Sequence, residues 1–172
     1  KYFPNNLSMF KKLSVIIPAY NEGRTIHLIL NKLKEVELLN GIEKEIIIIN
    51  DFSKDDTEEA VKKYMNLNPE MNIQYFKHEV NKGKGAALHT GIKKATGDYL
   101  IIQDADLEYD PQEFNLLLKP VLDGFADVVF GSRFIGGNAH RISFFWHTIG
   151  NKVLTFFSNM FSDLNLSDME TC

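Results

Sequence analysis

Cysteine is nearly absent from this sequence, since Cys172 is the only one among 172 residues. One cysteine cannot form a disulfide within the chain, so a disulfide-stapled secreted scaffold is excluded and a reducing compartment is favoured. No run of 18 or more apolar residues is present, so the sequence has no segment typical of a transmembrane helix. Residues 1–12 lack the apolar core of a signal peptide. We therefore expect a cytoplasmic protein.

An excess of positive charge is also lacking. The chain has 19 Lys and Arg against 23 Asp and Glu, for a formal net charge of −4 at pH 7. A nucleic-acid-binding domain usually carries a basic patch or stripe, so we expect no nucleic-acid partner.

Three glycine-containing motifs are missing. No G-x-G-x-x-G follows the first apolar run, and neither the P-loop G-x-x-x-x-G-K-[ST] nor a G-x-S-x-G nucleophile elbow occurs. Their absence argues against a dinucleotide oxidoreductase, a P-loop enzyme and a serine-nucleophile hydrolase.

Short apolar runs alternate with helical patterns along most of the chain. After the first run, residues 26–33 have apolar side chains at i, i+3, i+4 and i+7. Strands that alternate with helices of this length predict an α/β fold with a mostly parallel central sheet. We expect one domain over residues 13–172, incomplete at its C-terminal end, with residues 1–12 as an N-terminal extension. The expected strands cover residues 13–18, 45–50, 73–78, 98–104 and 126–133.

Residues 140–161 are dense in aromatic side chains. Their apolar positions form a broad helical stripe, interrupted by the polar residues Asn151, Lys152 and Asn159. Two interpretations fit this pattern: a helix that covers the core, or a helix that lies in a membrane interface with its apolar face toward lipid. The second interpretation places the protein peripherally at the inner face of a membrane.

Carboxylates gather at the end of the fourth expected strand. Asp104, Asp106 and Glu108 occupy alternate positions after the apolar residues 99–102, and residues i and i+2 of an extended segment point the same way. Mg²⁺ and Mn²⁺ prefer oxygen ligands and are commonly held by one or two carboxylates plus substrate phosphates. Aspartates also cap turns after strands, which is the alternative for an isolated Asp-x-Asp. The position at a strand end favours the metal site here.

Two basic residues are predicted at the same edge of the sheet. Lys84 lies in the turn NKGKG (81–85), whose glycines open the third expected helix. Such glycines bring backbone N–H groups close to an anion, although a plain flexible turn has the same composition. Arg133 ends the fifth expected strand, and a guanidinium suits bidentate pairing with a phosphate; a surface arginine is the alternative. The five histidines show no metal-ligand spacing, and we expect them at core edges or on the surface.

Four ordered motifs together resemble a known family. They are LSVIIPAYNEG (13–23), EIIIINDFSKDDT (45–57), NKGKGAALHTGIKKATGDYLIIQDADLEYDP (81–111) and ADVVFGSRF (126–134). These segments resemble family 2 glycosyltransferases with the GT-A fold, and most of all the branch of dolichyl- and polyprenyl-phosphate mannose or glucose synthases. The resemblance implies a Rossmann-like three-layer fold with an Asp-x-Asp metal motif, a nucleotide-sugar donor, and Mg²⁺ or Mn²⁺ as cofactor.

The resemblance also implies roles for residues that follow the first two expected strands. Pro18, Tyr20 and Glu22 of PAYNE would contact the nucleoside of the donor. Ile49 and Asp51 would border the base and the ribose.

The later motifs would hold the diphosphate part of the donor. Asp104, Ala105 and Asp106 would line the diphosphate, with Asp106 on the metal and Glu108 as a further metal ligand. Arg133 of GSR would touch the donor.

Two positions depart from the pattern of the family. Asn50 and Asp51 replace the usual pair of aspartates, so the first carboxylate is missing. Phe52 replaces the usual Gly or Asn, so we expect this turn to be shaped differently.

We expect an inverting, metal-dependent glycosyltransferase that moves a hexose from a UDP- or GDP-sugar to a polyprenyl or dolichyl phosphate. Asp168 would lie near the acceptor, where many inverting relatives carry a catalytic base. A phosphate monoester is largely dianionic near neutral pH and needs no strong base, so with that acceptor Asp168 would serve position or metal; capping of a turn is the bland alternative.

Three alternatives stay open for the activity. The first is transfer to a sugar hydroxyl of a cell-surface glycan, which would use Asp168 as a base. The second is a sugar-1-phosphate nucleotidyltransferase, which usually has a Gly- and Arg-rich loop after the first strand; PAYNEGRT lacks it. The third is a non-catalytic interaction module, against which the intact Asp-x-Asp argues.

Overall fold

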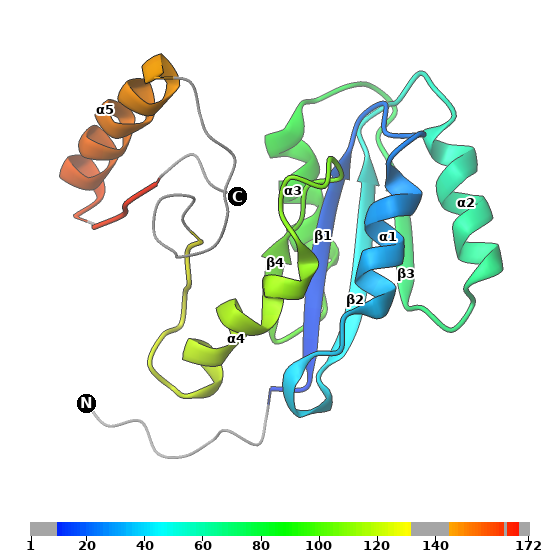
Figure 1. Ribbon diagram of the computed structural model, residues 1–172. Helices are drawn as coiled ribbons and strands as arrows, with labels where there is room; N and C mark the ends of the chain where they lie inside the picture. Colours follow the sequence, from blue (N-terminus) through cyan, green and yellow to red (C-terminus); the bar gives the residue numbers. More distant parts are fainter. Residues whose placement is uncertain (1–9, 132–144, 164, 169–172) are drawn as a thin grey trace. The chain divides into compact units, whose positions relative to one another are not determined.

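The computed structural model describes residues 10–131, 145–163 and 165–168, and the chain divides into two compact units, Lys1–Phe125 and Ala126–Cys172. The first unit is built on a sheet of four strands in the order β3-β2-β1-β4 (Figure 1). All three strand pairs are parallel, which confirms the parallel sheet predicted from the sequence. The strands are β1 (Lys12–Ala19), β2 (Glu43–Asn50), β3 (Ile73–Lys77) and β4 (Tyr99–Ile102).

The two inner strands, β1 and β2, are buried on both faces. Val15, Ile16 and Ile17 of β1 have no exposed surface, and neither do Ile48 and Ile49 of β2. Parallel strands covered on both faces have continuous apolar runs, which is why these two strands are evident from the sequence.

Helices cover both faces of this sheet, giving three layers (Figure 1). One core includes Val15 and Ile48 with apolar residues of α1 (Ile26–Glu35), α2 (Thr57–Leu67) and α4 (Phe114–Leu122). The other core includes Ile47 and Ile49 with Ala87 of α3 (Lys84–Lys94). Short 3-10 turns occupy Leu39–Gly41 and Pro111–Glu113, the second directly before α4.

Helix α3 approaches the sheet closely through a glycine. A Cβ built on Gly91 would lie 2.4 Å from Cγ2 of Ile16 in β1. Any larger residue at position 91 would therefore push α3 away from β1, and α3 begins at the edge of the sheet where β1 and β2 end.

The predicted fifth strand, 126–133, is wrong where the structure describes it. Residues 126–131 have no strand conformation, and Val128 and Phe130 are exposed. A strand requires a hydrogen-bonded neighbour in a sheet, and β4 remains the edge of the described sheet. β-branched and aromatic composition alone therefore misled this prediction.

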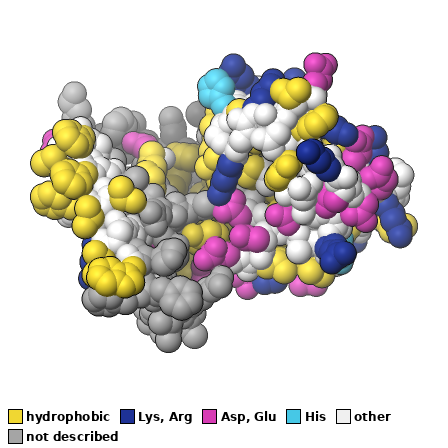
Figure 2. All heavy atoms as spheres, turned by 90° about the horizontal axis from the view of Figure 1, so that it is seen from above, with side chains coloured by type: hydrophobic (Ala, Val, Ile, Leu, Met, Phe, Trp, Pro, Cys, Tyr) yellow, Lys and Arg dark blue, Asp and Glu magenta, His cyan; other side chains and the backbone are white. Residues whose placement is uncertain are grey.

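The second unit contains the helix α5 (Phe145–Ser162). Trp146 and Phe161 are largely exposed, whereas the polar residues Asn151 and Thr155 are buried. Hydrophobic side chains gather on the surface of α5 (Figure 2). No helix among the described residues combines the length and the apolar character that crossing a membrane requires. The membrane-interface interpretation of this segment stays a prediction.

Candidate active site

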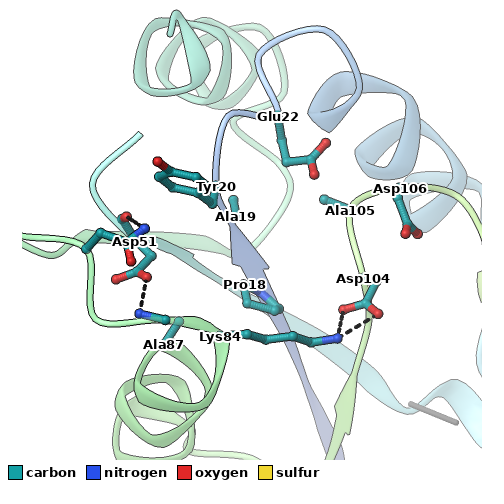
Figure 3. Close-up of a pocket in the computed structure, with 12 residues that line it drawn as sticks. Pro18, Ala19, Tyr20, Glu22, Asp51, Lys84, Ala87, Asp104, Ala105 and Asp106 are labelled. Atoms are coloured by element: carbon teal, nitrogen blue, oxygen red, sulfur yellow. Dashed lines mark hydrogen bonds and ion pairs between the residues drawn. The ribbon is translucent and has the colours of Figure 1, made fainter. Parts of the chain in front are cut away.

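A pocket of about 490 Å³ lies where β1 and β2 end, which is where parallel α/β sheets bind ligands (Figure 3). Four segments that are distant in the sequence line it: the end of β1, the turn after β2, the start of α3 and the turn after β4. Its lining residues are Pro18, Ala19, Tyr20, Glu22, Asp51, Asn81, Gly83, Lys84, Ala87, Asp104, Ala105 and Asp106.

Hydrogen bonds tie the turn after β1 to the turn after β2. Asn21 adopts a left-handed φ of 57°, its N–H donates to Oγ of Ser53 at 2.9 Å, and its Oδ1 accepts from Lys54 N at 2.9 Å. Glu22 N donates to Oγ1 of Thr57 at 2.8 Å. These bonds hold the backbone that follows Tyr20, whose side chain lines the pocket and stays 45% exposed.

Asp51 is a buried carboxylate held by several hydrogen bonds. Its Oδ1 lies 2.7 Å from Nδ1 of His78, and Oδ2 accepts from Gly83 N at 2.6 Å. Lys82 N lies 2.9 Å from Oδ1 and 3.1 Å from Oδ2. Burial raises the pKa of this carboxyl, but the bonds from His78, Lys82 and Gly83 outweigh burial, so the pKa lies below its usual value. Asp51 is therefore ionised at neutral pH.

Asn50, which stands where the family usually has an aspartate, has a structural role. Its side chain is fully buried, where Nδ2 donates to the hydroxyl of Tyr75 at 2.8 Å and Oδ1 accepts from Ser53 N at 2.8 Å. The amide thus shapes the turn instead of lining the pocket. Phe52 adopts a φ of 61° in the same turn. Gly and Asn tolerate this left-handed conformation more readily than Phe.

The turn after β4 presents the Asp-x-Asp segment. Asp104 accepts an ion pair from Lys84, whose Nζ lies 2.8 Å from Oδ1 and 2.9 Å from Oδ2 (Figure 3). Ala105 is buried, and Asp106 lines the pocket with an exposed side chain. Glu108 is exposed and does not line the pocket, but its N–H donates to Oδ1 of Asp106 at 3.0 Å.

The carboxylates of the described residues do not form a complete metal site by themselves. No group of three or more His, Cys, Asp or Glu side chains among these residues is placed to hold an ion. Asp106 and Glu108 could supply one or two oxygen ligands, which is the number that Mg²⁺ or Mn²⁺ uses when substrate phosphates complete the coordination. These oxygen ligands therefore fit a divalent metal that binds together with a diphosphate.

Most of the residues predicted to bind the donor meet in this pocket. Ile49 is fully buried in the core beside Ala87 and does not line the pocket. Arg133 lies outside the described residues. The predicted residues that line the pocket are Pro18, Tyr20, Glu22, Asp51, Lys84, Asp104, Ala105 and Asp106.

Asp168 belongs to the second unit, where it is buried against α5. Asn151 Nδ2 donates to its Oδ1 at 2.6 Å, and Thr155 Oγ1 donates to Asn151 Oδ1 at 2.9 Å. This chain of bonds fixes the carboxylate within its own unit, and the catalytic role of Asp168 stays a prediction.

Sequence reasoning did not assign Asn81, Gly83 or His78 to the site. Asn81 and Gly83 line the pocket beside the predicted Lys84. His78 was expected at a core edge or on the surface, but it is 8% exposed and lies against Asp51. Its position at the end of an expected strand was the available signal.

A parallel sheet covered on both faces, with carboxylates around a pocket at its carboxyl ends, defines a three-layer α/β architecture, as the GT-A fold predicted from the motifs requires. The chain belongs to glycosyl transferase family 2, whose sequence pattern matches residues 14–167. This match confirms the family predicted from the four motifs.

Similar proteins include two archaeal dolichyl-phosphate transferases. A dolichol-phosphate mannosyltransferase of Pyrococcus furiosus is 32% identical over 73% of this chain and 34% of its own length. A UDP-N-acetylglucosamine–dolichyl-phosphate N-acetylglucosaminyltransferase of Methanococcus voltae is 31% identical over 94% of this chain and 67% of its own length. The chain thus spans about a third of the first relative and two thirds of the second.

The fold also matches a solved glycosyltransferase. A mannosyltransferase from Pyrobaculum calidifontis, in complex with GDP-Man and Mn²⁺, superposes with a TM-score of 0.55 and 26% identity. The superposition covers 62% of this chain and 31% of that protein.

Proposed function

We propose that the pocket binds a nucleotide diphospho-sugar, and that the protein transfers its hexose to a dolichyl or polyprenyl phosphate. One observation carries this proposal. Carboxylates from three distant motifs, Glu22, Asp51 and the Asp104–Asp106 pair, line one pocket at the carboxyl ends of the strands. The relatives named as dolichyl-phosphate transferases support the acceptor class, and the two donors named among the similar proteins leave UDP and GDP both open.

A divalent metal would be held by Asp106, with Glu108 as a further ligand. The Mn²⁺ in the P. calidifontis complex supports this proposal, and Mg²⁺ suits the same oxygen ligands. When bound, the metal would neutralise the negative charge that develops on the leaving diphosphate.

The residues at the start of α3 are suited to the diphosphate. Lys84 brings a positive charge into the pocket, and Gly83 caps a helix of 11 residues whose N-terminus favours negative charge. In the resting pocket Lys84 is paired with Asp104. We propose that Lys84 contacts the diphosphate of the donor, and that Tyr20 and Asp51 lie on its nucleoside side.

The transfer itself would be an inverting displacement. An oxygen of the acceptor phosphate forms a bond to the anomeric carbon while the bond from that carbon to the nucleoside diphosphate breaks. The acceptor is already ionised near neutral pH, so Asp168 would orient the acceptor region instead of removing a proton. Such an acceptor is anchored in lipid, so the protein would work at the cytoplasmic face of a membrane.

Calorimetric titration with UDP- and GDP-sugars, with and without Mn²⁺, tests the donor site. We expect one nucleotide series to bind, with at least tenfold higher affinity when Mn²⁺ is present. Transfer of labelled hexose to dolichyl phosphate in detergent tests the acceptor. Binding of nucleoside triphosphate with pyrophosphate release would instead identify a nucleotidyltransferase, and transfer only to a glycan hydroxyl would reassign the acceptor.

A further inference from the structure

His78 occupies an unusual place for a histidine with no assigned role. It follows β3 directly and is only 8% exposed. Its backbone N–H donates to Asn50 O at 2.9 Å, so its backbone position is fixed against β2. Both ring nitrogens are engaged: Nδ1 lies 2.7 Å from Oδ1 of Asp51, and Nε2 lies 2.9 Å from Oγ1 of Thr90 in α3.

The bond to Asp51 has a defined direction. Asp51 is ionised, and an ionised carboxylate can only accept hydrogen bonds. Nδ1 of His78 must therefore carry a proton and donate it. Thr90 is itself held within α3, because its Oγ1 lies 3.0 Å from the carbonyl oxygen of Ala86. The bond to Thr90 thus fixes the Nε2 end of the imidazole against α3, and the Nδ1 end is directed at Asp51.

Asp51 passes this constraint to the turn that forms one wall of the pocket. Its carboxylate accepts from the backbone N–H groups of Lys82 and Gly83, and its carbonyl oxygen lies 3.3 Å from Nδ2 of Asn81. Gly83 is held at a φ of 85° by these contacts. A carboxylate offers about four acceptor positions, and His78, Lys82 and Gly83 occupy most of them. Asp51 therefore holds residues 81–83 in place, through its carboxylate at Lys82 and Gly83 and through its carbonyl oxygen at Asn81.

We propose that His78 is a positioning residue of the donor pocket: it orients the Asp51 carboxylate, which in turn holds Lys82 and Gly83 in the turn that lines the pocket. Its effect on the donor rests on the proposed function, but its effect on the turn does not. The alternative is that His78 has only a packing role, in which it attaches the end of β3 to α3. The two roles use different nitrogens of the ring, so they can be separated.

Two amide substitutions separate these roles. The side-chain N–H₂ of an asparagine is as many bonds from Cα as Nδ1 of histidine, and that of a glutamine matches Nε2. His78→Asn therefore keeps a donor toward Asp51 and loses the bond to Thr90, whereas His78→Gln does the reverse. His89→Gln, on the exposed side of α3, is the matched control.

Amide NMR of the ¹⁵N-labelled chain measures the position of the turn directly. In His78→Gln we expect the amide resonances of Lys82 and Gly83 to shift upfield and the exchange of these amide protons with water to become at least tenfold faster. In His78→Asn and in the control, both quantities should stay close to wild type. Equal changes in these resonances in the two substituted proteins, or larger changes in His78→Asn, would overturn the proposal. The wild-type chain gives an independent result: an imidazole ¹⁵N spectrum without a proton on Nδ1 would refute it even if both variants unfold.

Calorimetry with UDP and GDP in the presence of Mn²⁺ then measures the consequence for the donor. We expect His78→Gln to bind the preferred nucleotide about tenfold more weakly and His78→Asn to recover most of the affinity. If no nucleotide binds the wild-type chain, the proposed function fails while the NMR result still decides the positioning role. If the turn shifts but nucleotide affinity is unchanged, His78 does not position the donor pocket.

Discussion

Nζ of Lys84 lies 2.8 Å from Oδ1 of Asp104, so the resting pocket holds an ion pair between the start of α3 and the turn after β4. The side chain of Lys84 is half exposed, whereas that of Asp104 is 17% exposed. A lysine with this access can exchange its carboxylate partner for a phosphate without leaving the pocket.

Lys84→Met should therefore weaken nucleotide binding. Hydrogen bonds to charged groups contribute about 1.5–3 kcal/mol, which corresponds to a loss of roughly tenfold or more in affinity. Part of the salt dependence of binding should disappear as well, because one charge pair is removed. Calorimetry at low and high ionic strength measures both effects. Lys93→Met, exposed on the last turn of the same helix, is the control; equal losses in the two variants would contradict a specific contact.

Asp106→Asn should remove the metal dependence of donor binding and leave the fold intact. The side chain is exposed, so an isosteric amide should change stability by no more than about 0.5 kcal/mol. Nucleotide affinity should become nearly independent of Mn²⁺, since an amide oxygen lacks the charge of a carboxylate ligand. Thermal unfolding and nucleotide titration, each with and without Mn²⁺, provide the measurement. A variant that retains the wild-type response to Mn²⁺ would show that Asp106 is not the principal ligand.

Glu45 should make the first unit sensitive to acid. Its buried carboxylate accepts from Ser14 Oγ at 2.6 Å, Thr96 Oγ1 at 2.7 Å and Gln74 Nε2 at 2.9 Å. Burial raises its pKa, but the bonds from Ser14 and from Thr96, together with the charge of Lys12, outweigh burial and lower it. Because the folded-state pKa is the lower one, the stabilisation is present above the unfolded value of about 4.3 and is lost as pH falls through the folded value.

Glu45→Gln tests this dependence. The amide nitrogen cannot accept, so at least one buried donor loses its partner and the free energy of unfolding at neutral pH should fall by about 1–3 kcal/mol. Urea unfolding at several pH values should then show a flatter acid limb than in the wild type. Parallel pH profiles of the two proteins would mean that other carboxylates govern acid unfolding.

Gly91→Ala should destabilise the packing of α3 on β1. The new Cβ would lie 2.4 Å from Cγ2 of Ile16, and overpacking of this kind costs typically about 1–3 kcal/mol. Gly85→Ala in the same helix is the matched control, because a Cβ there meets nothing within 4 Å. That control should be neutral, or should stabilise by up to about 1 kcal/mol through helix propensity. Urea unfolding distinguishes the two; a stable Gly91→Ala variant would show that α3 shifts at little cost.

The strands that are buried on both faces were the most predictable elements. The runs 13–18 and 45–50 match β1 and β2 to within two residues, because a strand covered on both faces has a nearly continuous apolar run. The segment 126–133 has a similar composition, but its described residues form no ladder. Composition indicates that a segment suits a sheet, whereas pairing depends on the presence of a neighbouring strand.

The sequence by itself determined the family, the parallel sheet and the strand ends at which Tyr20, Asp51 and Asp106 lie, because these depend on local patterns and on the rule that parallel strands end at one edge. Only the tertiary structure decided which side chains meet there. Three of these contacts join residues that are 20 to 32 positions apart in the sequence. They are the hydrogen bonds of Asp51 with His78 and with Gly83, and the ion pair of Lys84 with Asp104. Such contacts follow from the order of the strands in the sheet and the close approach of α3, and hydrophobic periodicity encodes neither.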